Sequence, residues 1–428
     1  MLTRRGFIGT AAAGFAAGGM SMTAAEPVDP ARLERIRGLM YGTMIGDALG
    51  GPIEFQSPEK VAGLERAPKR WKRGEKLDDA AVAATKERLR WQWRDYTALR
   101  PEPEPYAHWS RKAPPGTITD DSRHKLVLLE SFGAMERDGG MEVEDLARAY
   151  LDWPRRAEVR AGEGRARLLQ DWLGEWEYAA RWVLGERDLA RARPPERMWN
   201  GLATCCGQMT SLPLACVFAG APGPAYEAAY RLGFFDNGWG RDLNAGIVAG
   251  LARALNVTVG RSPLDAWKEV LAAMVETDPY GYRSIPWCPR AVDRWMGVVR
   301  RRVSAARGEP ALLFEGLEEE FRETVKWEAQ VPFVVVLACW EIAGGDPLVA
   351  LALTLEWGHD TDSYAQIAGG FAGALYGTGI FPETWRRDVA ARLAADYGVG
   401  LEAEVLRLGR WHGLARSRPV VRGVPVLP

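Results

Sequence analysis

The chain has 428 residues, of which 47% are hydrophobic and 26% charged, and its formal net charge at pH 7 is −1. This composition is that of a globular protein, long enough for one large domain or two ordinary ones, and it lacks the basic excess expected of a nucleic-acid-binding protein. The five cysteines include no C-x-x-C motif, which argues against a disulfide framework or a cysteine zinc site.

The first 25 residues have the pattern of an export signal. The segment Thr3-Arg4-Arg5-Gly6-Phe7-Ile8 resembles the twin-arginine motif, an Ala/Gly-rich run follows from Gly9 to Gly19, and small residues permit cleavage after Ala25. The alternative is a membrane anchor, but the run is too short and too glycine-rich to span a bilayer well. We therefore predict a twin-arginine signal peptide over 1–25, recognised by the twin-arginine export machinery. The protein would then be exported, to the periplasm or outside the cell, with no stable membrane insertion after cleavage.

A buried helix is predicted to begin at Pro30, because apolar residues recur after it at helical spacing: Leu33, Ile36, Leu39, Met40, Met44 and Ile45. Gly42 and Gly46 stand four residues apart in this helix and would let another backbone approach closely. The glycines and the proline of residues 46–53 end the helix in a turn. Glu54 is presented just beyond that turn.

Two stretches rich in tryptophan and charge, 56–116 and 153–198, interrupt the apolar pattern. We interpret both as peripheral insertions, with helices at 79–93 and 171–184. Their tryptophans are expected to pack the insertions onto the body of the protein, and stacking on sugars is the alternative. The tail over 416–428 is rich in proline and valine, which indicates irregular structure.

The rest of the chain has apolar periodicity, and no run of residues alternates in the manner of strands joined by hairpin turns. The sequence therefore predicts an all-α fold. The expected helices lie at 125–132, 141–150, 214–219, 224–232, 243–255, 263–276, 290–307, 316–329, 332–343, 346–356, 362–376 and 382–396.

Two acidic clusters each stand at the start of a helix. Asp120 and Asp121 precede an apolar helix, with Asp121 or Ser122 as its expected N-cap, and Asp360 and Asp362 precede a helix of small residues. The helix dipole only partly stabilises such charges. Two aspartates packed together repel each other, so the pKa of one rises unless a cation neutralises them.

The ligand chemistry of these clusters favours a hard cation. They offer carboxylates and hydroxyls and no soft ligand, which favours Mg²⁺, Mn²⁺ or Ca²⁺ over Zn²⁺ or Cu²⁺. Taken singly, each cluster is also a common helix N-cap. Together, their four carboxylates could neutralise two divalent ions.

The combined motifs resemble the ADP-ribosylglycohydrolase family, which includes proteins of the dinitrogenase reductase-activating glycohydrolase type. The matching segments are residues 42–54, 119–122 and 358–370, in the order and local spacing of that family. The resemblance implies an all-α orthogonal multi-helix bundle over 30–415, with a dinuclear Mg²⁺ or Mn²⁺ centre in a central cleft. It places ligand roles on Thr119, Asp120, Asp121, Asp360, Asp362 and Ser363.

The resemblance also implies a reaction, the hydrolysis of an ADP-ribosyl or related N- or O-glycosidic bond. The metals would hold vicinal ribose-type hydroxyls and a water, and a carboxylate would assist proton transfer through an oxocarbenium-like transition state. Asp120, Asp121 and Glu54 are the candidates for this proton work. The alternative for Glu54 is structural, namely bonding backbone amides to hold its turn.

Two segments, 199–209 and 236–242, depart from the family pattern where relatives contact their substrate, so we expect a changed leaving group and distal pocket. The candidates for substrate binding are Asp47, Asn200, Gln208, Asn237, Trp239 and His359. Turn formation and packing are the alternative for the four in the departing segments, and His359 is expected to support the metal ligands rather than bind the metal. Export also favours a changed substrate, because intracellular ADP-ribosylated protein is not the obvious substrate outside the cytoplasm. The expected partner is a small-molecule or glycan substrate. Two further functions stay open, an exported carbohydrate glycosidase acting on a non-nucleotide sugar and a non-catalytic binding protein with the same fold.

Overall fold

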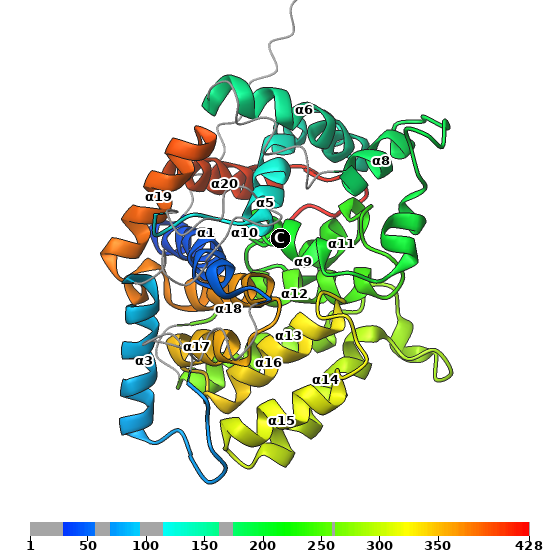
Figure 1. Cartoon of the computed structure of the whole chain (residues 1–428). Coiled ribbons are helices and arrows are strands. Elements are labelled where there is room, and N and C mark those ends of the chain that lie inside the picture. Colours follow the sequence, from blue (N-terminus) through cyan, green and yellow to red (C-terminus); the bar gives the residue numbers. More distant parts are fainter. Residues whose placement is uncertain (1–28, 56–68, 95–113, 162–173, 259–261, 428) are drawn as a thin grey trace, which may run out of the picture.

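Helices make up all the regular secondary structure of the described residues, which in this computed structural model are 29–55, 69–94, 114–161, 174–258 and 262–427 (Figure 1). The predicted all-α fold is therefore confirmed. The α-helices are α1 Pro30–Gly50, α3 Asp79–Arg94, α5 Asp120–Ser131, α6 Val143–Ala161, α8 Gly174–Val183, α9 Cys206–Thr210, α10 Leu214–Val217, α11 Pro222–Leu232, α12 Gly240–Ala254, α13 Pro263–Glu276, α14 Ala291–Ala306, α15 Pro310–Glu320, α16 Gln330–Ile342, α17 Pro347–Trp357, α18 Thr361–Tyr376, α19 Glu383–Tyr397 and α20 Leu401–Ala415.

Short 3₁₀ turns connect several of these helices: η1 Gly51–Ile53, η2 Phe132–Glu136, η3 Pro195–Gly201, η4 Tyr282–Ser284 and η5 Thr378–Ile380. Two isolated β-bridges, between Met141 and Val421 and between Thr204 and Glu328, join segments that are distant in the sequence. The second bridge places the start of the 203–210 segment beside the turn that precedes α16.

The centre of the bundle is a seam between α1 and α18, drawn blue and orange in Figure 1. Gly42 of α1 lies against Gly369 of α18, so a Cβ added at Gly42 would stand 2.0 Å from the Gly369 carbonyl oxygen. The same holds for Gly46, where an added Cβ would stand 2.0 Å from the carbonyl oxygen of Ala365. The close backbone approach predicted for Gly42 and Gly46 is thus confirmed, and it brings the two ends of the core together.

The other helices pack around this seam in two groups. α12, α16 and α17 contact α18, and α13, α14 and α15 extend outward from them, in the lower part of Figure 1. α19, α20 and η5 contact α1, while α5 touches α1, α6 and α9. α3 lies on the outside against α17. This arrangement leaves the N-termini of α5 and α18 on the same side of the seam.

Tryptophans of the two predicted insertions pack into the body of the protein where the structure describes them. Trp153 is fully buried, Trp71 donates its Nε1 hydrogen to Glu356 at 2.7 Å, and Trp93 stacks on Trp385 at a ring-centroid distance of 5.2 Å. The packing role predicted for them is confirmed at these positions. Much of both insertions, 56–68, 95–113 and 162–173, lies outside the described residues.

Several predicted helix bounds need correction. The helix expected at 316–329 is wrong, since α15 spans Pro310–Glu320 and the chain then turns to reach the bridge at Glu328. α5 begins at Asp120 with Thr119 as its N-cap, ahead of the expected Asp121 or Ser122. α6 continues to Ala161, into the predicted second insertion, and α20, Leu401–Ala415, was not predicted.

The tail after α20 has no helix, as predicted, but it packs tightly rather than trailing over the surface. Val420 and Val421 are buried, and the Met141 backbone N–H donates to the Val420 carbonyl at 2.8 Å. Among the described residues, no helix combines the length and the apolar character that a membrane span requires. The predicted signal peptide over 1–25 lies outside the described residues.

Candidate metal centre

Five carboxylates from three segments meet beside the N-termini of α5 and α18. Carboxylate oxygens of Glu54, Asp360 and Asp362 all lie within 4.8 Å of one another, and so do those of Asp120, Asp121 and Asp362. Asp362 belongs to both groups, so the two groups are adjacent. Four of these side chains are buried, and Asp120 is partly exposed. The two acidic clusters that are separate in the sequence therefore form one site.

The N-terminus of α5 is fixed from two directions. Thr119 caps the helix, its Oγ1 accepting a hydrogen bond from the Asp121 N–H at 3.1 Å. Asp47 of α1 lies beneath it and accepts from the Thr119 N–H at 3.0 Å and from the Ser122 N–H at 3.1 Å. Asp47 is fully buried and caps the N-terminus of α5, and the contact with substrate expected of it stays a prediction.

The N-terminus of α18 is presented by a sharp turn. Gly358 and His359 both have positive φ angles, 89° and 65°, and Asp360 follows as the N-cap. Thr361 donates its hydroxyl hydrogen to the Gly50 carbonyl at 2.7 Å, which ties this turn to the end of α1. Because Glu54 follows α1 by only four residues, the same bond brings Glu54 to Asp360 and Asp362.

Burial and mutual repulsion govern the ionisation of the cluster. Burial raises the pKa of Asp121 well above its usual range, and the neighbouring Asp362 and Asp120 raise it further. Burial and the charge of Asp362 likewise raise the pKa of Asp360. Buried like charges need a cation to ionise together. The oxygen-only donor set, with the hydroxyls of Thr119 and Ser363 beside the carboxylates, fits Mg²⁺ or Mn²⁺.

Three residues that contact the carboxylates or their backbone were not predicted from the sequence. Gln366 donates its Nε2 hydrogen to Asp121 Oδ1 at 2.5 Å, and the buried ammonium of Lys125 donates to the Asp121 carbonyl at 3.1 Å. The Cys205 sulfur lies 3.8 Å from Ser363 Oγ and 4.0 Å from Asp360 Oδ2. A signal existed for the first two, because Gln366 and Lys125 each follow an acidic residue by four positions on the same helix face.

Lys125 supplies a positive charge beneath the carboxylates. Its side chain is fully buried, and burial lowers the pKa of Lys125 to about 8, while the attraction of Asp121 and Asp47 opposes that shift. An ammonium in this place offsets part of the negative charge. It would reduce the positive charge that any bound cation has to supply.

The His359 side chain contacts Glu318 and Trp357. Its Nε2 lies 2.6 Å from Glu318 Oε1, and its ring packs against Trp357 at 4.6 Å between centroids. Its carbonyl accepts a hydrogen bond from the Phe55 N–H at 2.7 Å. His359 thus shapes the turns that present Asp360 and Glu54 through its backbone.

The candidates in the departing segments divide into two kinds. Gln208 and Asn237 are buried and hold neighbouring segments, Gln208 by donating to the Ala329 carbonyl at 2.8 Å and Asn237 by donating to the Met198 carbonyl at 2.9 Å. Asn200, with a positive φ of 57°, and Trp239 are exposed. The hydrogen bonds of the buried pair are those expected of a packing role, and the exposed pair is accessible to a ligand. Substrate binding by all four residues stays a prediction.

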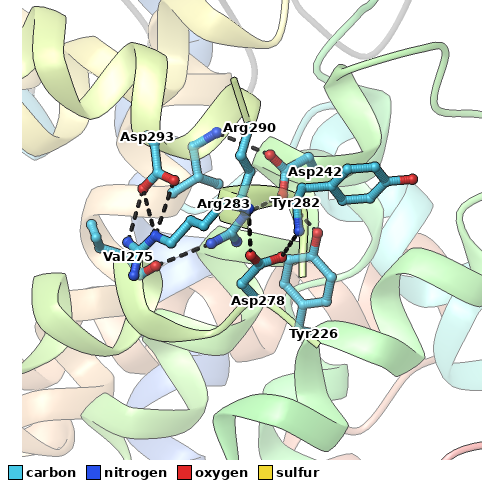
Figure 2. Close-up of polar contacts among 9 residues, drawn as sticks. Tyr226, Asp242, Val275, Asp278, Tyr282, Arg283, Arg290 and Asp293 are labelled. Carbon is cyan, nitrogen blue, oxygen red and sulfur yellow. Dashed lines mark hydrogen bonds and ion pairs between the residues drawn. The ribbon is translucent and has the colours of Figure 1, made fainter. Parts of the chain in front are cut away.

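The end of the second departing segment is anchored away from the metal centre by the polar network in Figure 2. Asp242 accepts hydrogen bonds from the Tyr226 hydroxyl at 2.6 Å and from Arg290 Nε at 3.0 Å. Close by, Arg283 pairs with Asp293 at 2.9 Å. This network joins α11, α12 and α14, so Asp242 serves the scaffold of the segment.

An aromatic pair flanks the acidic groups and was not predicted. Phe55 directly follows Glu54, and its ring meets Trp327 edge to face at 6.1 Å between centroids. The Trp327 carbonyl accepts from the N–H of Cys205, the residue beside Asp360. Phe55 is 51% exposed and Trp327 42% exposed. Exposed rings at this position offer a stacking surface to whatever enters the site.

Comparison with known proteins extends the similarity beyond the three motifs. A solved structure described as an "ADP-ribosylglycohydrolase-related protein complex" is similar to this chain, with 20% sequence identity and a TM-score of 0.47, covering 89% of this chain and 99% of that one. No curated protein matches the sequence. The family model for ADP-ribosylglycohydrolase matches residues 28–412. Because that match runs from before α1 into α20, the chain belongs to the ADP-ribosylglycohydrolase family.

Proposed function

We propose that this chain is a metal-dependent glycohydrolase that cleaves an ADP-ribosyl or related N- or O-glycosidic bond with two divalent ions, Mg²⁺ or Mn²⁺. Family membership implies a glycohydrolase-type activity, and the family is typically metal-dependent. The observation that supports the dinuclear centre is the sharing of Asp362 by two groups of three carboxylates. Two hard cations on such groups would balance the charge of the buried carboxylates.

The residues of the centre divide into ligands and a proton carrier. Thr119, Asp120, Asp121, Asp360, Asp362 and Ser363 would hold the ions. When bound, the ions would orient vicinal hydroxyls and lower the pKa of a water molecule. Glu54 lies within reach of Asp360 and Asp362 but on the loop side of the site. A carboxylate there can carry the proton that glycoside hydrolysis requires, and Asp120 and Asp121 are the alternatives.

Removal of metal tests this proposal directly. Dialysis against EDTA should abolish turnover of ADP-ribosylated substrates, and Mn²⁺ or Mg²⁺ should restore it. Metal should also raise the melting temperature by roughly 3–4 °C, because saturating ligand adds about 3 kcal/mol to the stability of the folded state and the entropy of unfolding of a chain of this size is about 0.9 kcal/mol/K. Full activity in EDTA would contradict the proposal, and Zn²⁺ serves as the mismatched control ion.

A second candidate is an exported carbohydrate glycosidase that uses the same metal centre on a non-nucleotide sugar. The observation that supports it is the exposed pair of Phe55 and Trp327 beside the carboxylates, since exposed aromatic rings pack against the faces of sugar rings. A screen of glycans and of ADP-ribosylated compounds, each with Mn²⁺, separates the two functions by which panel is hydrolysed. Binding without turnover on both panels would instead identify a non-catalytic binding protein.

We further propose that the twin-arginine machinery exports the chain, supported by Thr3-Arg4-Arg5-Gly6-Phe7-Ile8. Fractionation of cells should place the wild-type chain outside the cytoplasm with residues 1–25 removed. Replacement of Arg4 and Arg5 by lysine should retain the protein in the cytoplasm. Unchanged export of the double variant would exclude this route.

A further inference from the structure

A polar pocket lies at the other end of α1, away from the carboxylates. It has a volume of about 270 Å³, and its polar lining is formed by Arg32, Asn256, His412 and Arg416. Residues 219–221, between α10 and α11, and Leu427 in the tail complete the walls. Four segments that are distant in the sequence thus converge on it. About 27 Å of helix separate Arg32 from the end of α1 at the metal centre.

Arg32 is held in place by neutral partners. Its Nη2 donates to Asn256 Oδ1 at 2.5 Å, and its Nη1 lies 3.2 Å from His412 Nε2. His412 is buried, and its Nδ1 lies 3.0 Å from the Val217 carbonyl. Since a carbonyl only accepts, Nδ1 carries the hydrogen, and Nε2 of the neutral ring accepts from Arg32. These contacts use two of the five N–H groups of Arg32. Because Asn256 and His412 are neutral, they do not neutralise the positive charge of Arg32.

The surroundings add positive potential. Burial, Arg32 and Arg416 lower the pKa of His412, although its bond to Val217 opposes this shift. Arg32 lies in the first turn of α1, where the helix dipole disfavours a cation. The nearby N-cap residue of α1, Asp29, accepts from the Ala31 N–H of its own helix. Among the described residues, the lining of the pocket contains no carboxylate.

We propose that this pocket binds a phosphate-type dianion, either inorganic phosphate or a small phosphomonoester. Two guanidinium groups provide planar forks of N–H donors that match phosphate oxygens. Arg32 is already oriented by Asn256 and His412, so little side-chain entropy is lost on binding. The site is independent of the glycohydrolase proposal, because it shares no residue with the metal centre.

Isothermal titration of the full-length chain tests this site. Inorganic phosphate and glycerol 3-phosphate should each bind with a saturable stoichiometry of 1:1, and acetate should bind at least about tenfold more weakly, because one carboxylate carries half the charge. Arg32→Gln should weaken phosphate binding by about tenfold or more, the loss expected for one charge-assisted contact. Phosphate held at the metal centre would be insensitive to that change. The two phosphate compounds distinguish a site for the bare ion from one that also accepts an organic group.

The matched control is Arg410→Gln, on the same helix as His412 and paired with Glu136 on the surface. It should bind phosphate within about twofold of the wild type. Arg416→Gln, at an exposed position, is the second variant, and it should also weaken phosphate binding. It keeps the test valid if Arg32→Gln does not fold. Absence of saturable phosphate binding, equal binding by wild type and both pocket variants, or acetate affinity equal to phosphate affinity would overturn the proposal.

Discussion

The Asp362→Ala variant should lose at least about a thousandfold in turnover, because it removes the one carboxylate that both groups of the metal centre share. Lewis-acid stabilisation contributes several kcal/mol to such reactions, and each 1.4 kcal/mol corresponds to a factor of ten in rate. The variant should also lose the rise in melting temperature on addition of Mn²⁺. Steady-state assays and thermal unfolding with and without metal measure the two effects.

The fold itself should tolerate this change. Asp362 is buried next to Asp360 and Asp121, and its charge raises the pKa of both of these carboxyl groups. Its removal therefore relieves electrostatic repulsion in the metal-free protein. The control is Asp265→Ala, at an exposed position in the first turn of α13, which should keep both turnover and the response to metal. Retention of the Mn²⁺-dependent stabilisation in Asp362→Ala would show that the ions bind elsewhere.

The Gly42→Ala variant should be destabilised by roughly 3 kcal/mol or more, at the upper end of the cost of overpacking. The added Cβ would stand 2.0 Å from the carbonyl oxygen of Gly369, and a backbone atom in a packed seam has little room to shift. For a protein of this size, such a loss lowers the melting temperature by roughly 3–4 °C. Chemical denaturation and calorimetry of the purified variant measure it.

Gly297→Ala is the matched control. Gly297 also lies inside a helix, α14, but there the nearest atom to an added Cβ is the flexible Arg301 Nη1 at 3.7 Å. Alanine is favoured over glycine in a helix by roughly 0.5–1 kcal/mol, so this variant should be as stable as wild type or slightly more stable. Equal melting temperatures for the two variants would show that the seam is looser than described.

The acidic motifs could be read from the sequence because each is local. Asp120 with Asp121, and Asp360 with Asp362, stand at helix starts that apolar periodicity reveals, and the structure places them together with Glu54. Their supports are tertiary. Residues that come to the site from other elements, such as Cys205 and Trp327, have no local signal that distinguishes them from ordinary core or surface residues.

The same distinction explains the missed elements. α20 contains two glycines, Gly409 and Gly413, which weaken its helix propensity, but α1 and α10 pack against it and provide the stabilisation that its sequence does not. The predicted helix at 316–329 continued a charged, helix-favouring pattern past Phe321. There the backbone instead turns, and Ala329 bonds to the Ala203 carbonyl at 2.9 Å. In both places tertiary contacts override local preference.

The seam between α1 and α18 has a consequence for biosynthesis. Its two halves, around Gly42 and Gly369, are separated by almost the whole chain, so α1 leaves the ribosome long before its partner exists. At common elongation rates of roughly 5–20 residues per second, that interval is tens of seconds. The apolar, glycine-lined face of α1 lacks its final cover throughout it. Chaperone contacts with the nascent chain should therefore concentrate on residues 36–50, and the acidic site can acquire cations only after synthesis has passed α18.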